Sequence, residues 1–249
     1  MDASSLSRVA ALIPALNEAG SIGAVVHELR RRGVERIVVA DNGSTDETAQ
    51  VVREAGGRVV HEPRRGYGRA CLAGLAHLFG HGDPPDVILF LDGDGADELA
   101  SIPELVGPVL DGEAEMAIGR RVSGRDVGNA RTHARVGSRV MLRLARWIHG
   151  LEAEDLGPFR AVGRTLLHRM QMDDPTWGWT LQMQLRAHHL GAPVVEVEVP
   201  RRPRTAGRSK VSGSLWISVR AGVRMGWTLV REWWWGRRVR RRRKGTPGG

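Results

Sequence analysis

The sequence predicts an α/β fold in which helices flank a central, mostly parallel sheet. Through the first half of the chain, short apolar or β-branched runs alternate with amphipathic segments of helical length. This order is typical of parallel strands that are joined by helices. The run 87–91 is apolar at every position, as expected of a strand that is buried on both faces. Apolar residues make up 41% of the 249 residues and charged residues 26%, which is the composition of an ordinary globular protein.

The first half of the chain opens on an apolar run, residues 9–16, which predicts the first strand. Residues 21–32 carry apolar side chains at helical spacing between a candidate N-cap, Ser21, and a candidate C-cap, Gly33. The β-branched run 36–40 predicts a second strand. By the same reasoning, the elements that follow are a helix over 44–55, a strand over 58–61, a helix over 70–78, a strand over 87–91 and a strand over 115–118.

The second half of the chain is richer in helices. Residues 194–199 alternate Val and Glu, which predicts a strand with one polar face. Residues 236–249 combine an arginine run with a Pro-Gly-Gly end, and we expect a basic, disordered tail there. The helices expected in this half cover residues 129–149, 166–170, 179–189 and 214–235.

The net charge of +9 is unevenly distributed. Seven positive charges lie in residues 237–244, so the rest of the chain carries +2. With a nearly neutral body and no helix-turn-helix, zinc or RNA-recognition pattern, a nucleic-acid binder is the least favoured hypothesis, and we expect no nucleic-acid partner. A single cysteine, Cys71, excludes a disulfide framework and a four-thiolate zinc site. No apolar run reaches the length of a membrane span, and the first residues lack the basic segment of a signal peptide, so we expect a cytoplasmic protein.

Polar and acidic residues follow three of the predicted strands, at the point where each strand ends. They are Asn17 with Glu18, Asp41 with Asn42, and Asp92 with Asp94. In an open parallel sheet the ligand binds at the carboxyl ends of the strands, so we expect these side chains to meet at one edge. Two carboxylates two residues apart repel each other unless a cation lies between them, and carboxylate oxygens suit Mg²⁺ or Mn²⁺. Asp92 and Asp94 therefore predict a metal site, on a surface turn.

Two rival motifs fail on their spacing. A calcium loop that started at Asp92 would need Gly at its sixth position, where Asp97 stands, and Glu at its twelfth, where Pro103 stands. A dinucleotide-binding turn over residues 66–71 would need a third glycine, where Cys71 stands. Neither a calcium-binding nor a dinucleotide-binding function is therefore expected.

The ordered set of motifs resembles family 2 glycosyltransferases with the GT-A fold. Over residues 9–120 the matching segments are PALNE at 14–18, DNGSTD at 41–46, RGYG at 65–68 and LDGD at 91–94. Three later segments are similar to the dolichyl-phosphate mannose and polyprenyl-phosphate sugar synthases, namely DLGPFRA at 155–161, GWT at 178–180 and GRSK at 207–210. The resemblance implies one GT-A domain over residues 1–235, with a nucleotide-sugar half (1–120) and an acceptor half (121–235), before the tail.

The resemblance also implies a role for each matching residue. Asp41 would hydrogen-bond the nucleotide base, and Asp94 would hold Mg²⁺ or Mn²⁺ on the diphosphate, with Asp92 beside it as a metal and nucleotide contact. The other residues implied in nucleotide-sugar binding are Pro14, Leu16, Glu18, Gly68 and Gly93. The residues implied in binding the phosphate of the acceptor are Arg131, Ser138, Arg208 and Lys210. Asp155 would be an acceptor-side acid, and the implied catalytic set is Asp94, Asp155, Arg131 and Arg208.

This sequence departs from the mannose synthases at two positions. Their Gln, two residues past the second Asp of the DGD turn, is Ala96 here, and Asp97 is the candidate replacement for that metal contact. Position 182, often Glu in relatives, is Gln182. We therefore expect no catalytic acid at position 182.

The attacking group decides which reaction is expected. An alcohol needs a general base, whereas a phosphate monoester is mostly dianionic at neutral pH and needs cations to position it. The predicted helix 129–149 supplies arginines at 131, 135, 139, 143 and 146, with no acid between them. We expect a metal-dependent, inverting transfer from a UDP- or GDP-linked sugar to a polyprenyl phosphate. A soluble hydroxyl acceptor, with Asp155 as the base, is the alternative.

The predicted C-terminal helix carries one apolar stripe with arginines beside it. The stripe consists of Trp216, Val219, Val223, Trp227, Val230 and Trp234, and the arginines are Arg220, Arg224 and Arg231. Tryptophan favours membrane–water interfaces, and arginine binds anionic headgroups. With the basic tail, this pattern predicts peripheral binding to an anionic membrane surface, at the inner face of the membrane.

Overall fold

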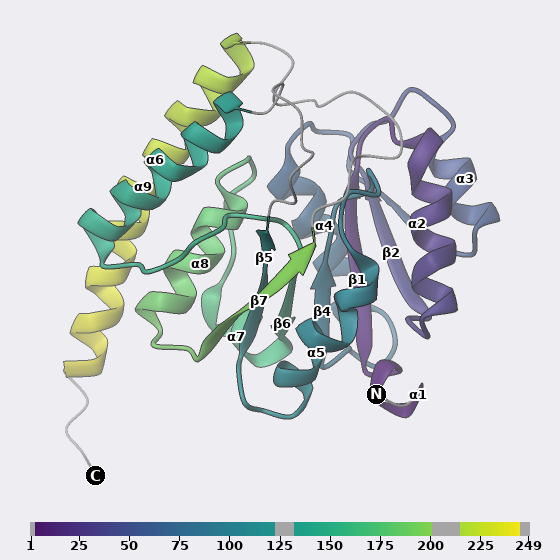
Figure 1. The fold of residues 1–249 in the computed structure, drawn as a ribbon, viewed down its shortest axis with the longest axis horizontal. Helices are drawn as coiled ribbons and strands as arrows, with labels where there is room; N and C mark the ends of the chain where they lie inside the picture. The colour runs from purple at the N-terminus through teal and green to yellow at the C-terminus, as the bar shows by residue number, and fades with distance from the viewer. Residues whose placement is uncertain (1–2, 123–131, 201–214, 245–249) are drawn as a thin grey trace.

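A seven-stranded sheet forms the centre of the molecule (Figure 1). The computed structural model describes residues 3–122, 132–200 and 215–244. Its strands are β1 (Val9–Ala15), β2 (Arg36–Asp41), β3 (Arg58–His61), β4 (Val87–Phe90), β5 (Met116–Val122), β6 (Arg160–Gly163) and β7 (Val194–Pro200), in the sheet order β3-β2-β1-β4-β6-β5-β7. Neighbouring strands are parallel except that β6 runs antiparallel to β4 and to β5. The predicted α/β fold with a mostly parallel sheet is confirmed.

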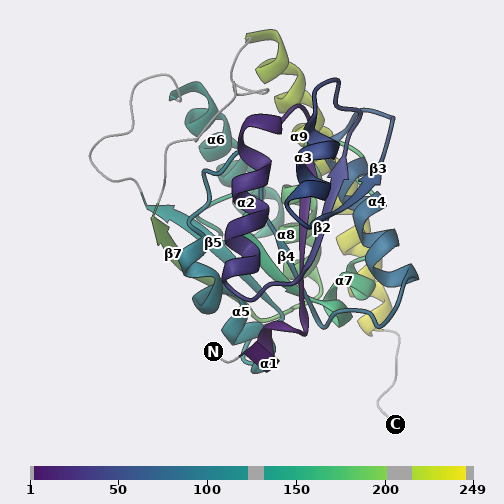
Figure 2. The ribbon, with the colours of Figure 1, turned by 90° about the vertical axis from the view of Figure 1, so that its right-hand side faces the viewer.

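Helices cover both faces of this sheet (Figures 1 and 2). Successive residues of a strand point to opposite faces. In β1, Ala11 and Ile13 pack in one apolar cluster with α2 and α5, whereas Ala10 and Leu12 pack in a second cluster with α4, α7 and α8. The helices are α1 (Ala3–Leu6), α2 (Ala19–Arg31), α3 (Thr48–Glu54), α4 (Tyr67–Gly80), α5 (Ile102–Leu110), α6 (Thr132–His149), α7 (Arg164–Met170), α8 (Trp179–His189) and α9 (Leu215–Lys244), with a 3₁₀ turn at Leu99–Ser101.

Three helices of the first half start at positions that differ from the prediction, and one of them, α4, begins at Tyr67 rather than at residue 70. Helix α2 begins at Ala19, so Ser21 lies inside its first turn instead of at its N-cap. Helix α3 begins at Thr48 rather than at residue 44. The delay has a local cause, because the Asp46 carboxylate accepts hydrogen bonds from the backbone N–H and the hydroxyl of Thr48 at 3.1 and 2.5 Å and holds the preceding residues in a turn.

Two elements of the sheet layer were not predicted from the sequence. Strand β6 spans only four residues, and it begins with the charged Arg160. Helix α5 begins beside Pro103 and contains Pro108, so its helical spacing is obscured by residues that disfavour a helix interior. Both elements lie in the centre of the fold, where β6 pairs with β4 and β5, and α5 covers one face.

The C-terminal helix is longer than predicted. Helix α9 continues through Lys244, so the expected disordered tail is wrong over residues 236–244. Arginine and lysine are good helix formers, and no proline interrupts them before residue 247. Residues 245–249 lie outside the described part of the chain, as do the side chains of Trp216, Val219 and Arg220.

A buried polar network holds α9 on α8. Glu232 is completely buried, and Arg186 donates to its two carboxylate oxygens at 2.8 and 3.0 Å. Gln182 donates to Glu232 at 2.7 Å and to Asp173 at 2.6 Å. A buried ion pair that loses one partner leaves an uncompensated charge in the interior, so the network fixes α9 on the body. Gln182 thus has a packing role, in agreement with the expectation that it is no catalytic acid.

The packing of α9 can be tested at a glycine. A Cβ on Gly236 would lie 2.5 Å from the His189 ring. Gly236→Ala should therefore lower the free energy of unfolding by about 1–3 kcal/mol, the usual cost of overpacking. Gly226→Ala, in the same helix, is the matched control: its Cβ would meet nothing within 4 Å, and it should stabilise by up to about 1 kcal/mol. Urea unfolding measures both values, and equal stability of the two variants would contradict the packing of α9 on α8.

Candidate active site at the carboxyl ends of the strands

The loops that follow β1 and β2 are joined by hydrogen bonds. Asn17, which has a left-handed φ of 50°, donates its backbone N–H to the Ser44 hydroxyl at 2.9 Å and accepts from the Thr45 N–H at 2.8 Å. The Glu18 N–H donates to the Thr48 hydroxyl at 2.8 Å. Since the parallel register places Ala15 beside Asp41, the polar residues at the ends of both strands meet at one edge, as the sequence predicted.

Asp41 lies buried at the end of β2. One of its carboxylate oxygens accepts from the Ser44 N–H at 3.0 Å, and the other lies 3.1 Å from Nδ1 of His61, at the end of β3. His61 was not singled out in the sequence, because its contact with Asp41 depends on the pairing of β2 with β3. The two hydrogen bonds hold the carboxylate at the edge of the sheet.

Asn42 and the glycines of the RGYG segment shape the neighbouring loop. The Asn42 amide donates to the carbonyls of Glu62 and Arg64 at 3.0 and 2.8 Å, and its oxygen accepts from the Gly66 N–H at 2.7 Å. The Gly68 N–H donates to the Thr176 carbonyl at 3.2 Å, and a Cβ on Gly68 would collide with the backbone at Asp174. The structure therefore gives Gly68 a packing role, with its N–H directed to the protein backbone.

The DGD turn after β4 is folded back on itself. The Asp94 carboxylate accepts from the Ala96 N–H at 2.9 Å, and Asp97 accepts from the Asp92 N–H at 3.0 Å. The Ser21 hydroxyl donates to the Gly93 carbonyl at 2.8 Å, which ties the turn to α2. Asp94 is only 4% exposed, so the expectation that it lies on a surface turn is wrong, although Asp92 and Ala96 of the same turn are half-buried.

Asp97 adds a third carboxylate to this region. It is 9% exposed, and burial raises the pKa of Asp97 to about 6, further supported by the nearby charges of Asp94 and Asp155 and opposed by Arg121. Its position beside the Asp92 N–H makes it a support for the turn. Whether Asp97 also replaces the missing Gln as a metal contact stays a prediction.

Arg121, at the end of β5, is the functional residue that sequence reasoning missed. Its guanidinium donates to both oxygens of Asp155 at 2.9 Å, and its backbone N–H donates to the same carboxylate at 3.1 Å. Burial alone would raise the pKa of Asp155, but the hydrogen bonds and charge of Arg121 outweigh it and hold that pKa below its usual value. Asp92 and Asp97 also act on Arg121 and help to raise its pKa. Arg121 is thus hydrogen-bonded to Asp155 and lies within the electrostatic reach of the DGD turn.

Arg160 brings the DLGPFRA and GWT segments together. The side chain is 1% exposed and donates to the carbonyls of Gly157 and Thr180, at 3.1 Å from Nε and from Nη1. Burial lowers the pKa of Arg160 to about 10. The Gln184 amide donates to the Asp155 carbonyl at 2.7 Å. Two segments that are distant in sequence therefore hold Asp155 in place beside the DGD turn.

The predicted phosphate-binding residues are mostly outside the described structure. Arg131, Arg208 and Lys210 lie in or beside residues 123–131 and 201–214, which the structure does not describe. Ser138 is half-buried in α6. The pocket residues Pro14, Leu16 and Glu18 are half-buried at the end of β1, on the Asp41 side of the site.

A divalent metal fits the DGD turn if the substrate supplies ligands as well. In the described residues no group of three or more His, Cys, Asp or Glu side chains is placed to hold a metal ion. Mg²⁺ is usually held by one or two carboxylates together with substrate phosphates, not by a cage of protein ligands. Asp94 and Asp92, two carboxylates on one turn, match that kind of site.

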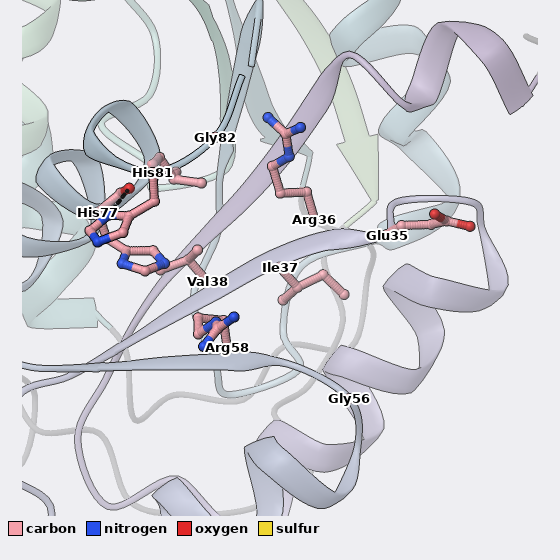
Figure 3. A pocket seen from close by; sticks show the side chains of 10 residues that line it. Glu35, Arg36, Ile37, Val38, Gly56, Arg58, His77, His81 and Gly82 are labelled. Atoms are coloured by element: carbon pink, nitrogen blue, oxygen red, sulfur yellow. Dashed lines mark hydrogen bonds between the residues drawn. The ribbon is translucent and has the colours of Figure 1, made fainter. Parts of the chain in front are cut away.

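A separate cavity of about 560 Å³ lies away from this edge (Figure 3). Arg36 and Arg58 begin β2 and β3, and His77 lies near the end of α4. The cavity therefore opens at the amino ends of these strands. Ligands of parallel α/β sheets bind at the carboxyl ends, so the candidate active site is at the opposite end of the sheet from this cavity.

Comparisons with known proteins match most of the chain. The model of the glycosyl transferase family 2 matches residues 10–170. An uncharacterized glycosyltransferase of Mycobacterium tuberculosis is 38% identical over 209 residues, which cover 83% of this chain and 91% of that protein. An undecaprenyl-phosphate mannosyltransferase of Micrococcus luteus is 28% identical over 238 residues, which cover 91% of this chain and 96% of that protein.

Solved structures agree on the fold. The crystal structure of glucosyl-3-phosphoglycerate synthase from M. tuberculosis, in complex with Mn²⁺ and UDP-glucose, matches with a TM-score of 0.72 at 23% identity. The match covers 93% of this chain and 83% of that chain. The two proteins therefore share the same arrangement of a central sheet and flanking helices.

The buried acid at the turn predicts a pH effect on stability. Because the pKa of Asp97 is about 6 in the folded chain and 3.8 is its ordinary value, the folded chain keeps a proton that the unfolded chain loses. The free energy of unfolding therefore falls as the pH rises between these values. In metal-free buffer, Asp97→Asn should remove this fall and be more stable than the wild type by about 1–3 kcal/mol at neutral pH.

Urea unfolding across this pH range tests the effect. Asp111→Asn is the control, since Asp111 is an exposed aspartate at the end of α5. Its pH profile should run parallel to that of the wild type. A parallel profile for Asp97→Asn as well would show that the buried carboxyl does not titrate as the structure requires.

Proposed function

The chain belongs to glycosyl transferase family 2, and from that premise we propose that it transfers a sugar from a nucleotide diphosphate to a polyprenyl phosphate at a membrane surface. One observation carries the choice of acceptor: Asp155, the base that a hydroxyl acceptor would need, is held in a two-pronged ion pair by Arg121. A carboxylate with a lowered pKa is a poor proton acceptor. A phosphate acceptor has no need of that base.

The relatives support this acceptor. The Micrococcus luteus protein is named an undecaprenyl-phosphate mannosyltransferase, and a Haloferax volcanii relative, 28% identical over 207 residues, is named a dolichyl-phosphate hexose transferase. Both names describe a polyprenyl phosphate as the group that receives the sugar. We propose the same class of acceptor for this chain and do not assign the sugar.

On the donor side, residues at the carboxyl ends of the strands bind the nucleotide sugar. Asp41 contacts the nucleotide base, and Pro14, Leu16 and Glu18 line the same pocket. Asp92 and Gly93 contact the nucleotide sugar, and Asp92 with Asp94 would hold Mg²⁺ or Mn²⁺. When bound, such an ion neutralises charge that grows on the diphosphate as the sugar leaves.

On the acceptor side, cations replace a base. Arg131, Ser138, Arg208 and Lys210 bind the acceptor phosphate, whose oxygen attacks the anomeric carbon from the face opposite the diphosphate. The new carbon–oxygen bond forms as the bond to the diphosphate breaks, and the nucleoside diphosphate leaves with the electron pair. The configuration at the anomeric carbon is inverted, and the dianionic phosphate needs to lose no proton.

Asp94→Asn tests the donor half of the proposal. The amide keeps an oxygen that can accept from the Ala96 N–H, so the turn should fold, but it loses the negative charge toward the metal. Transfer should fall by roughly 10²–10³-fold, the usual effect of removing one group that stabilises developing charge. Asp83→Asn, at an exposed aspartate, is the control. Full activity of Asp94→Asn in chelator-treated buffer would overturn the metal role of the turn.

The acceptor is tested by two groups of variants. Arg131→Ala and Arg208→Ala should each slow transfer to a prenyl phosphate by about ten- to a hundredfold, the value of one charge-assisted hydrogen bond. Hydrolysis of the donor by water should fall much less, because water does not use these arginines. Rates of both reactions are measured from mildly acidic to mildly alkaline pH.

Arg121→Gln and Asp155→Asn together test the alternative, a hydroxyl acceptor with Asp155 as base. Each variant removes the same ion pair, from one side or the other. If Asp155 only positions other groups, both variants should lower the transfer rate by similar factors and add no new pH dependence. A hydroxyl acceptor with Asp155 as base predicts that Asp155→Asn alone abolishes transfer while Arg131→Ala and Arg208→Ala are silent. That outcome would replace the lipid phosphate with a soluble hydroxyl acceptor.

A further inference from the structure

Large apolar side chains are exposed on one flank of the molecule. Of the seven large hydrophobic residues that are exposed in the described chain, six lie on α6 and α9 and one, Val194, on β7. The six, which we call the tryptophan face, are Val140, Trp147, Val223, Trp227, Val230 and Trp234. Exposed apolar side chains that gather on one surface mark an interaction site.

The α9 part of the tryptophan face is a regular stripe. Its four residues are spaced by four, three and four positions, which places them within an arc of about 60° on the helix. Thr228 and Glu232, on the opposite side of α9, are buried against the body. The helix therefore buries two polar residues on its inward side and carries an apolar stripe on its outward side, where an ordinary surface helix is polar.

Helix α6 extends the same face. Trp147 is 83% exposed, the highest value among the exposed large hydrophobic residues of the described chain. The inward sides of α6 and α9 share one apolar cluster, in which Ala145 packs with Leu229. Figure 1 shows the two helices side by side along the flank, and their contact supports this.

A chain of hydrogen bonds fixes the two helices relative to each other. Arg240 can only donate, so Nδ1 of His189, 3.3 Å away, is the acceptor. The Nε2 atom of His189 then donates to Nδ1 of His149 at 3.1 Å, and Nε2 of His149 donates to the Leu229 carbonyl at 3.1 Å. Burial lowers the pKa of both histidines, of His189 to about 3. The two histidines are therefore neutral, and these hydrogen bonds link α6, α8 and α9.

Arginines lie along the tryptophan face. Arg139 and Arg143 on α6 are exposed, as are Arg224 and Arg238 on α9. Arg231 is different from the sequence expectation, because it turns inward to ion pairs with Asp174 and Glu232, at 3.4 and 3.3 Å. The end of α9 adds the positive run 237–244, which contains no acid.

We propose that α6 and α9 together dock the protein on the surface of an anionic lipid bilayer, with the tryptophan face in the headgroup region and the arginines on anionic headgroups. Indole rings and arginine stems are favoured at that boundary. A second copy of this chain would bring arginines against arginines. A nucleic acid would use the arginines and leave the valines exposed. No helix of the described residues is long and apolar enough to cross a membrane, so the pair lies on the surface.

Docking by the tryptophan face would bring the protein to the membrane that holds a lipid acceptor. This link between docking and the acceptor rests on the proposed function. The arrow of β7 points toward the end of the molecule where α6 and α9 begin (Figure 1). The carboxyl ends of the parallel strands, with the DGD turn and Asp41, are at that end. The site edge and the starts of the two docking helices are therefore at the same end of the molecule.

Co-sedimentation with vesicles tests the face. Vesicles of phosphatidylcholine alone are compared with vesicles of phosphatidylcholine and phosphatidylglycerol in equal parts, without polyprenyl phosphate. The wild type should bind the anionic vesicles, and Trp147→Ser and Trp227→Ser should each weaken binding by about tenfold, the effect of one large apolar side chain that is no longer buried. Val194→Ser, which removes an exposed hydrophobic residue outside the face, should bind as the wild type does.

Each other result overturns the proposal or part of it. If Trp147→Ser binds like Val194→Ser while Trp227→Ser is weak, α6 is not part of the docking surface. If neither tryptophan variant differs from Val194→Ser, or if binding is equal to neutral and anionic vesicles, the proposed face is wrong. Dimerisation that both tryptophan variants abolish, without vesicle binding, would assign the face to a second copy. Urea unfolding confirms that the variants fold.

The failure of this inference can be told apart from failure of the proposed function. The vesicles hold no acceptor, so their binding reports only on the docking face. Transfer to a short, water-soluble prenyl phosphate reports only on the acceptor. Vesicle binding without transfer would overturn the polyprenyl phosphate acceptor and leave the docking face standing, and transfer without vesicle binding would do the reverse.

Discussion

The ion pair between Arg121 and Asp155 holds the two halves of the site together. Arg121 comes at the end of β5, and Asp155 lies in the segment that leads into β6. The side chain of Asp155 is 15% exposed and that of Arg121 32%, so loss of Arg121 would leave a mostly buried carboxylate without its partner. The charges of Asp92 and Asp97 also act on Arg121, and the proposal of a phosphate acceptor rests on this ion pair.

The same requirement for paired charges shapes the C-terminal helix. Arg186, Glu232 and Asp173 satisfy one another beneath α9, and Leu229 packs beside them. The apolar stripe of α9 takes no part in this packing and faces outward beside the exposed residues of α6. Exposing these apolar side chains to water is costly, and contact with a lipid headgroup region would remove that cost. A transfer to a lipid phosphate would then take place beside that surface.

The sequence was most informative where a motif is local. The donor-side edge was predictable because Asp41 and Asp92 each follow directly on a continuous apolar or β-branched run, and parallel strands carry their ends to one edge. Arg121 was missed because its partner is 34 residues away and the contact depends on β5 and β6 being neighbours. Strand β6 was missed because its four residues carry no alternation, and its place comes from pairing on both sides. The directions of Arg231 and Trp147 follow from packing against other helices, which periodicity on one helix does not contain.

The claim that a phosphate receives the sugar is tested most directly by product analysis with the unmodified chain. The protein is incubated with UDP- and GDP-linked sugars and Mn²⁺, and is offered a short polyprenyl phosphate or the polyprenol of the same length that lacks the phosphate. Mass spectrometry identifies the products. The account predicts a sugar-phosphate-prenyl product that requires the metal, with no product from the alcohol. Transfer to the alcohol at an equal or higher rate would contradict it.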